Sequence, residues 1–172
     1  MLKKICDLVE KVCTALGMLA VFLFFICTAW QVGSRILGIS APFTEEVANA
    51  AFAWATFMGC AVLLRKNDHF RFTAFSAKLK GKAFFINESI ILLILLAFSA
   101  LIAVHGVQLT KLFYNWKFTS MPSVSKAWGW ACVPACGFAS VLFCLESIIG
   151  FVRDPKTREI HDELEEIEAE VE

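Results

Sequence analysis

The chain has 172 residues, of which 58% are hydrophobic and 19% charged, and its acidic and basic residues balance to a formal net charge of zero. A soluble domain of this size is about 45–50% apolar and spreads its charges over its whole surface. Here the charges cluster between long uncharged runs, which excludes an ordinary water-soluble core. We expect one membrane bundle over residues 1–152 and a charged cytoplasmic tail over residues 153–172.

Four segments are long and apolar enough to cross a bilayer as helices, which takes about 20 largely apolar residues each. The predicted spans cover about residues 12–34, 44–64, 87–110 and 127–152. The first span carries no charge and is longer than the apolar core of a signal peptide, so we expect it to persist as a helix. Pro134 should interrupt the fourth helix, because it cannot donate a hydrogen bond to the carbonyl of Trp130.

The charges that flank the spans predict the orientation, because Lys and Arg concentrate in cytoplasmic segments. One side of the bundle carries twelve Lys and Arg residues, and both chain ends lie on that side. The other side carries four, which are Arg35, Lys111, Lys117 and Lys126. Aromatic residues suited to the lipid headgroup region lie at this second side: Trp30, Tyr114, Trp116, Trp128 and Trp130. The sequence therefore predicts that both termini are cytoplasmic.

The cytoplasmic loop between the second and third spans alternates apolar and basic residues from 70 to 85 at helical spacing. Two interpretations stay open for this loop: an amphipathic helix lying in the membrane interface, or a solvated basic loop.

Small residues at four-residue spacing favour close helix packing in a membrane. One such stripe on the second span comprises Ala51, Ala55 and Gly59, and another on the fourth comprises Ala131, Ala135 and Ala139. One stripe is expected to face the bundle and the other a partner. The seven cysteines lie mainly in apolar runs without metal-ligand or disulfide spacing, so we expect them to be small buried side chains.

Few charged residues enter the spans, and each is a functional candidate. Glu45 and Glu46 begin the second helix, where its dipole favours anions and where Thr44 is a plausible cap; an inter-subunit contact is the alternative. Glu146 is expected to be the one buried charge, paired with a basic loop residue or with a neighbouring subunit. Only His105 lies within a span, so a bis-histidine haem is excluded.

No nucleophile–base pair, zinc-ligand spacing or glycine-rich phosphate loop is present in the sequence. We therefore expect neither enzymatic activity nor a bound cofactor.

Polar and aromatic residues follow a distinctive order along the chain. The first half contains Arg35, Thr44-Glu45-Glu46, Trp54, Phe57-x-Gly59 and Arg65-x3-His69, and the second half contains Thr119, Pro122, Trp128 and Pro134-x2-Gly137. This order and spacing resemble those of a known family, the small DctQ-like membrane subunit of tripartite ATP-independent periplasmic (TRAP) transporters. The resemblance covers nearly the whole chain.

This resemblance implies a subunit of the bacterial inner membrane with two protein partners, a large membrane carrier subunit and a periplasmic substrate-binding protein. It implies uptake of organic acids of the C4-dicarboxylate or sialic acid type, driven by a sodium gradient that the large subunit uses. Membrane lipids are further partners, and nucleic acid is not expected. The residues that are candidates for subunit or binding-protein contacts are Arg35, Glu45, Glu46, Trp54, Ala55, Gly59, His69, Lys117, Lys126, Trp128 and Glu146.

Three other kinds of four-helix membrane protein fit less well. A disulfide-forming redox enzyme and a tetraspan scaffold both need cysteines in the outer loops, and residues 35–46 and 111–127 contain none. A small multidrug exporter needs an acidic residue in its first span, which is uncharged here. A redox or scaffold protein unrelated to transport is kept as the alternative.

Overall fold

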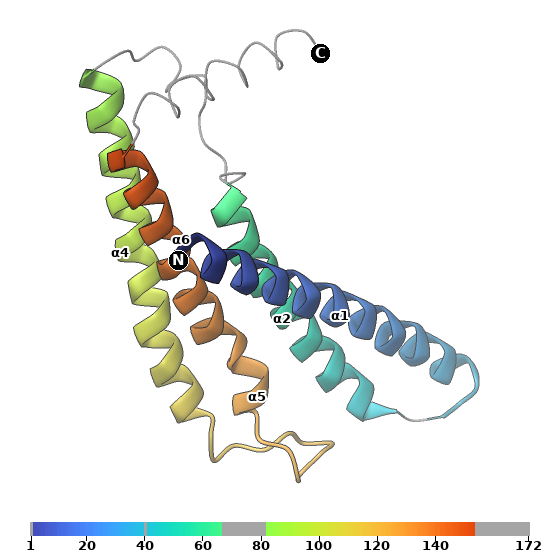
Figure 1. Cartoon of the computed structure of the whole chain (residues 1–172). Coiled ribbons are helices and arrows are strands. Elements are labelled where there is room, and N and C mark those ends of the chain that lie inside the picture. Colours follow the sequence, from blue (N-terminus) through green and yellow to red (C-terminus); the bar gives the residue numbers. More distant parts are fainter. Residues whose placement is uncertain (1, 40, 67–81, 154–172) are drawn as a thin grey trace, which may run out of the picture.

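The helices of the chain are seen in a computed structural model that describes residues 2–39, 41–66 and 82–153. In chain order they are α1 (Leu2–Ile36), α2 (Pro42–Lys66), α4 (Lys82–Leu112), α5 (Ala127–Trp130) and α6 (Cys132–Arg153) (Figure 1). Four stretches are long and apolar enough to cross a membrane: Leu2–Ile36, Pro42–Lys66, Phe85–Leu112 and Ala127–Arg153. The prediction of an all-α protein with four transmembrane helices is confirmed. The loop predicted as an interfacial helix lies outside the described residues, apart from 82–85, which open α4.

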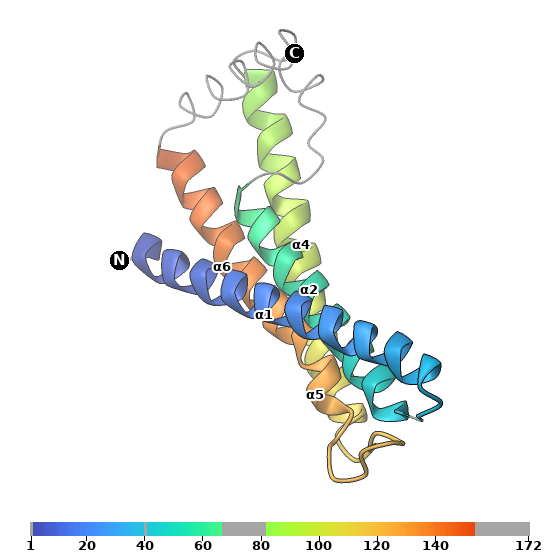
Figure 2. The ribbon, with the colours of Figure 1, turned by 90° about the vertical axis from the view of Figure 1, so that its right-hand side faces the viewer.

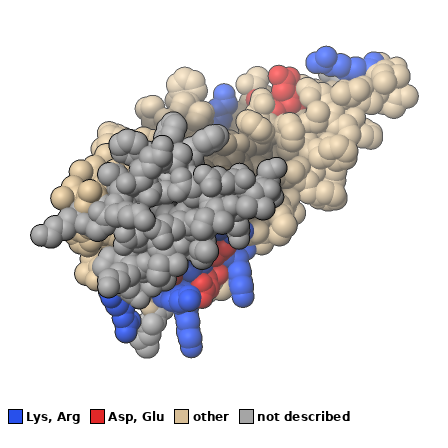
Figure 3. All heavy atoms as spheres, turned by 90° about the horizontal axis from the view of Figure 1, so that it is seen from above, with Lys and Arg blue, Asp and Glu red and all other residues tan. Residues whose placement is uncertain are grey.

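The helices pack as two pairs, α1 on α2 and α4 on α6, and contacts between α2 and α6 join the pairs. Figures 1 and 2 show that α1 runs obliquely to α4 and α6. At 35 residues, α1 is about 50 Å long, well above the roughly 30 Å of a bilayer core, so a tilt accommodates it. Viewed end-on, most of the described surface is uncharged and the charged side chains form small groups (Figure 3).

Residues 37–39, which follow α1, are held by backbone hydrogen bonds to its last residues. Gly38 adopts a φ of 69°, which glycine tolerates best, and the amide of Ile39 bonds to the carbonyl of Ser34 at 2.9 Å. Helix α2 then begins at Pro42, two residues before Thr44. The prediction that Thr44 caps this helix is therefore wrong: its hydroxyl donates back to the carbonyl of Ala41 at 2.7 Å.

The core between α1, α2 and α6 is built largely from small side chains, with Met58 and Phe143 filling its centre. Six of the seven cysteines are buried, Cys60 is half-buried, and none of the seven is in a disulfide. The prediction that the cysteines serve as small buried side chains is confirmed.

Helices α4 and α6 approach closely at two glycines that the predicted alanine stripes do not include. A Cβ atom on Gly137 would lie 2.5 Å from the Cα of Ala103, and one on Gly106 would lie 2.7 Å from the nitrogen of Pro134. Both distances are shorter than real side chains allow. The absence of these two side chains therefore sets the α4–α6 spacing.

The predicted interruption near Pro134 is confirmed, since α5 ends at Trp130 and α6 begins at Cys132. Pro134 cannot donate to the carbonyl of Trp130. The hydroxyl of Thr110 in α4 lies 3.5 Å from this oxygen, while its shorter bond, at 2.9 Å, goes to the carbonyl of Gly106 in its own helix.

The expectation that Glu146 is the one buried charge is wrong, because Glu88 in α4 is 1% exposed. Helix α4 starts at Lys82, well before the predicted apolar run, so its first turns pack on the end of α6. The rings of Phe85 and Phe151 stack there with centroids 4.9 Å apart.

Candidate functional site

Polar contacts gather at the two ends of α2. At its N-terminal end, residues 113–126 connect α4 to α5 and fold back on themselves; we call this segment the hairpin. The amide of Lys126 bonds to the carbonyl of Trp116 at 2.7 Å, and that of Phe118 bonds to Val124 at 3.1 Å. The Ser125 hydroxyl also donates to the carbonyl of Tyr114 at 2.7 Å. These bonds give the hairpin a defined shape without regular strands among the described residues.

Glu46 of α2 holds the tip of the hairpin. One carboxylate oxygen accepts a hydrogen bond from the amide of Thr119 at 2.8 Å, and the other accepts one from Ser120 at 2.9 Å. Charge-assisted bonds of this kind are stronger than neutral ones. Its neighbour Glu45 is exposed and has no such bond among those described. Of the two predicted glutamates, Glu46 therefore fixes the loop to the bundle.

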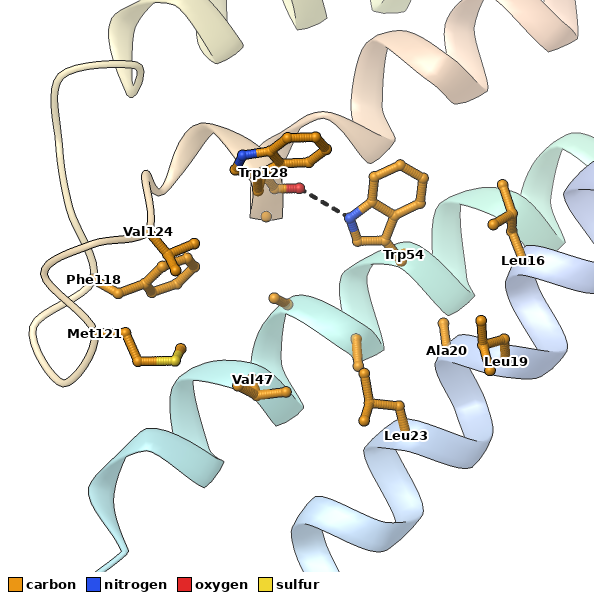
Figure 4. Close-up of a pocket in the computed structure, with 13 residues that line it drawn as sticks. Leu16, Leu19, Ala20, Leu23, Val47, Trp54, Phe118, Met121, Val124 and Trp128 are labelled. Carbon is orange, nitrogen blue, oxygen red and sulfur yellow. Dashed lines mark hydrogen bonds between the residues drawn. The ribbon is translucent and has the colours of Figure 1, made fainter.

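A second contact ties α2 to the chain that follows the hairpin. The indole Nε1–H of Trp54 donates to the carbonyl of Trp128 in α5 at 3.0 Å (Figure 4). Trp54 is half-buried, whereas the side chain of Trp128 is 71% exposed. Two predicted residues thus meet, and Trp128 contributes its backbone while its ring remains free for another contact.

An apolar cavity of about 360 Å³ lies beside this contact, between α1, α2 and the hairpin (Figure 4). Its walls include Leu19 and Leu23 of α1, Val47 of α2, and Phe118 and Met121 of the hairpin. None of its lining residues is charged, so the cavity suits an apolar chain or ring.

At the other end of α2, Arg65 meets three carboxylates, and these four residues form what we call the Arg65 cluster. Its guanidinium bonds to Glu146 of α6 through Nε at 2.9 Å and Nη2 at 3.1 Å. It bonds to Asp7 of α1 at 2.5 Å and also to Glu10. The Arg65 side chain is 11% exposed, and it lies 5.4 Å from the ring centre of Phe143.

The Arg65 cluster uses the fork geometry of arginine, which presents five N–H donors in a plane. Asp7 and Glu10 are three residues apart on α1, so both face the same side of that helix. The cluster therefore binds α1, α2 and α6 together at one level of the bundle. Glu146 was predicted to pair with a basic loop residue or with a neighbouring subunit; in the structure its partner is Arg65 of the same chain, in the last turn of α2.

Sequence reasoning did not select Asp7, Glu10 or Arg65 as site residues. A signal for the two acids exists in the sequence. Asp7 and Glu10 lie at helical spacing just before the first predicted span, and Arg65 is the first basic residue after the second span, at the same end of the bundle. The amides of Thr119 and Ser120 carry no side-chain signal, although the following Pro122 marks a turn.

Two further predicted residues belong to the hairpin: Lys117 is exposed, and Lys126, its last residue, is partly exposed and lines a pocket together with Glu46. Arg35, near the end of α1, is exposed and joins neither group in the described contacts. Ala55 and Gly59 line a second apolar groove, of about 700 Å³, between α1 and α2. His69 lies outside the described residues. The predicted set is therefore spread over both ends and one face of α2.

No group of His, Cys, Asp or Glu with metal-binding geometry occurs in residues 2–39, 41–66 and 82–153. Glu46 and Arg65, at the two ends of α2, bond to other parts of the protein, so these contacts join helices and loop.

The sequence of this chain is similar to those of known proteins. Residues 24–154 match the family described as tripartite ATP-independent periplasmic transporters, DctQ component. The chain is also 29% identical over 155 residues to the sialic acid TRAP transporter small permease protein SiaQ of Vibrio cholerae serotype O1. That alignment covers 89% of this chain and 87% of the relative.

Proposed function

Because the chain belongs to the DctQ component family of tripartite ATP-independent periplasmic transporters, we propose that it braces a large carrier subunit and helps to dock a periplasmic binding protein. It is a multi-pass protein of the bacterial inner membrane and the small permease subunit of a transporter. The observation that carries the docking role is the hairpin held by Glu46 at one end of the bundle.

We also propose that this hairpin lies in the periplasm. The twelve-to-four bias of Lys and Arg favours cytoplasmic termini, and the hairpin lies on the side with four. A rigid loop offers a defined docking surface, since little ordering entropy is lost on binding. The exposed ring of Trp128 and the partly exposed Lys126 flank this surface and suit a partner of mixed apolar and acidic character.

The bracing role rests on the apolar flanks and on the Arg65 cluster. Long apolar side chains cover the outward face of α1, including Phe22 and Phe25, which are 63% and 68% exposed. They frame the groove lined by Ala55 and Gly59. We assign this groove to a transmembrane helix of the large subunit, because small residues let helix backbones approach closely in a membrane.

The cargo and the energy source belong to the complex in this proposal. The relationship to a small permease of a sialic acid transporter supports an organic acid of that type as cargo. A carrier must offset the desolvation of a carboxylate with positioned donors or cations. Arg65 and Glu46 already bond to other parts of this chain, so we place cargo binding and sodium coupling in the large subunit.

Reconstitution into proteoliposomes tests the function directly. With a sodium gradient, binding protein and radiolabelled sialic acid, the small subunit alone should give no uptake. Both membrane subunits together should restore uptake, and the large subunit alone should give little or none. Transport by the small chain alone, or full transport without it, would contradict the proposal.

A further inference from the structure

The apolar cavity between α1, α2 and the hairpin adjoins a second cavity of different chemistry. The second cavity, of about 290 Å³, lies between α2, the hairpin and α5. No charged residue lines the first cavity, whereas Glu46, Asn49 and Lys126 line the second. Three residues belong to the walls of both: Ala50, Phe118 and Gly129. An apolar space and a polar one therefore lie side by side next to the hairpin.

The apolar cavity is open to the surrounding bilayer. Leu19 and Leu23 of α1 line it and are 63% and 42% exposed, so a lipid tail can enter it from the side. Figure 4 shows Met121 of the hairpin on one side of this space and Leu23 on the other. Because lipid tails are as apolar as leucine, this cavity alone gains little by taking one up. Selectivity for one lipid has to come from the polar cavity beside it.

The polar cavity holds one cation and one anion. The ammonium group of Lys126 presents three donors, which suits a phosphate group. Each carboxylate oxygen of Glu46 accepts one bond, from the amide of Thr119 or of Ser120, and keeps a second lone pair for a further donor. A headgroup that contains both a phosphate and an ammonium complements both charges, whereas an anionic headgroup complements Lys126 and is repelled by Glu46. The two residues therefore favour a zwitterionic headgroup.

We propose that the two cavities together bind one zwitterionic glycerophospholipid from the leaflet on the side of the hairpin. Lys126 and Asn49 bind its phosphate, and Glu46 accepts hydrogen bonds from its primary ammonium. One acyl chain lies in the apolar cavity, between Leu23 and Met121. Phosphatidylethanolamine has this headgroup chemistry, whereas phosphatidylglycerol is anionic and has no ammonium. The bound lipid contacts α1, α2 and the hairpin, so it adds to the attachment of the hairpin through Glu46.

The test uses the full chain, alone and with the large subunit, in liposomes of phosphatidylcholine, whose quaternary ammonium cannot donate a hydrogen bond. A trace of photoreactive lipid is added, with a diazirine near the end of one acyl chain and either an ethanolamine or a glycerol headgroup. Mass spectrometry identifies the labelled residues after irradiation. We expect the ethanolamine probe to label Met121 about tenfold more than the glycerol probe, the factor that one charge-assisted hydrogen bond contributes. Both probes should label Phe98 equally, because it is exposed on α4 and lines neither cavity.

Matched variants test the two parts of the site. Lys126→Gln should lower the labelling of Met121 by the ethanolamine probe about tenfold. Lys117→Gln, the same change at an exposed hairpin residue outside both cavities, should leave it unchanged. Ala50→Leu, in the shared wall, should also lower the labelling, whereas Ala97→Leu at an exposed position of α4 should not.

Two results on the unaltered chain would overturn the proposal, and both hold even if a variant fails to fold. The first is equal labelling of Met121 by the two probes when the small subunit is reconstituted alone. The second is a preference for the ethanolamine probe that disappears when the large subunit is present, because a side chain of that subunit then fills the site.

Discussion

The carboxylate of Glu46 on α2 is bonded to the backbone amide of Ser120, 74 positions later in the chain, at 2.9 Å. Its other oxygen is bonded to the amide of Thr119 at 2.8 Å, so the contact fixes both the position and the direction of the hairpin tip. Several consequences of this and the other contacts can be measured.

Replacing Glu46 by Gln should loosen the hairpin. The amide group keeps one acceptor oxygen but presents N–H donors to an amide that is itself a donor, so one of the two bonds is lost. We expect hydrogen exchange at Thr119 and Ser120 to become about tenfold faster, while the core helices keep their protection. Glu45→Gln is the matched control and should leave both amides unchanged. Equal effects of the two variants would show that charge alone matters.

Replacing Arg65 by Met should destabilise the bundle strongly, because three carboxylates then lose their shared cation. Breaking a fully buried pair costs about 3–5 kcal/mol, and the partial exposure of Asp7 and Glu10 lowers our expectation to about 2–3 kcal/mol. The loss in the free energy of unfolding can be measured in mild detergent, with the accessibility of the buried thiols as the signal of unfolding.

Two further variants define the Arg65 cluster. Lys66→Met, at the exposed neighbouring position, should have little effect. Glu146→Gln in the Arg65→Met background should cost less than it does alone, because its partner is already absent. Additive costs would argue against a direct coupling of these two residues.

Replacing Gly137 by Ala should force α4 and α6 apart, since the new Cβ would lie 2.5 Å from Ala103. We expect a loss of about 1–3 kcal/mol in stability, which is typical of overpacking. Gly150→Ala in the same helix is the control, because nothing lies within 4 Å of its added Cβ. If both variants behaved alike, the close crossing of α4 and α6 would be refuted.

Replacing Ala55 by Leu should weaken the proposed contact with the large subunit by about 1–3 kcal/mol, because the side chain fills the groove between α1 and α2. The yield of intact complex in detergent measures this effect. Phe52→Leu, at a nearby position that is 57% exposed and does not line the groove, places the same side chain outside it and serves as the control. An unchanged yield for Ala55→Leu would indicate that this groove faces lipid.

The proposed orientation can be tested by labelling single cysteines in a cysteine-free chain. A cysteine at Ser123, which is exposed in the hairpin, should react with a membrane-impermeant maleimide added to intact cells that have a permeabilised outer membrane. One at Thr157 should react only after the inner membrane is opened. The reverse pattern would invert the proposed topology.

Hydropathy predicted the number and order of the membrane helices because each apolar run is long enough to be recognised from its own residues alone. It did not predict the Arg65 cluster. Asp7 and Glu10 precede the predicted first span, and a count of apolar residues stops at charges that a helix can continue through. Their partner Arg65 lies 58 and 55 positions away, and no local pattern encodes that pairing.

The role of Glu46 shows a related limit. The helix dipole alone explains an acidic residue in the first turns of a helix. The sequence therefore provides no reason to expect that Glu46 also bonds to a distant loop. The close approach at Gly137 is likewise invisible in sequence, because a single glycine carries no information on which backbone crosses it. Such contacts depend on the tertiary arrangement of the helices.

The attachment of α2 at both ends has a mechanical consequence. The helix is 25 residues long, about 37 Å, and it is joined to the hairpin through Glu46 and to α1 and α6 through Arg65. A hydrogen-bonded helix resists stretching, so a displacement of the hairpin should also shift the Arg65 cluster at the opposite end of α2.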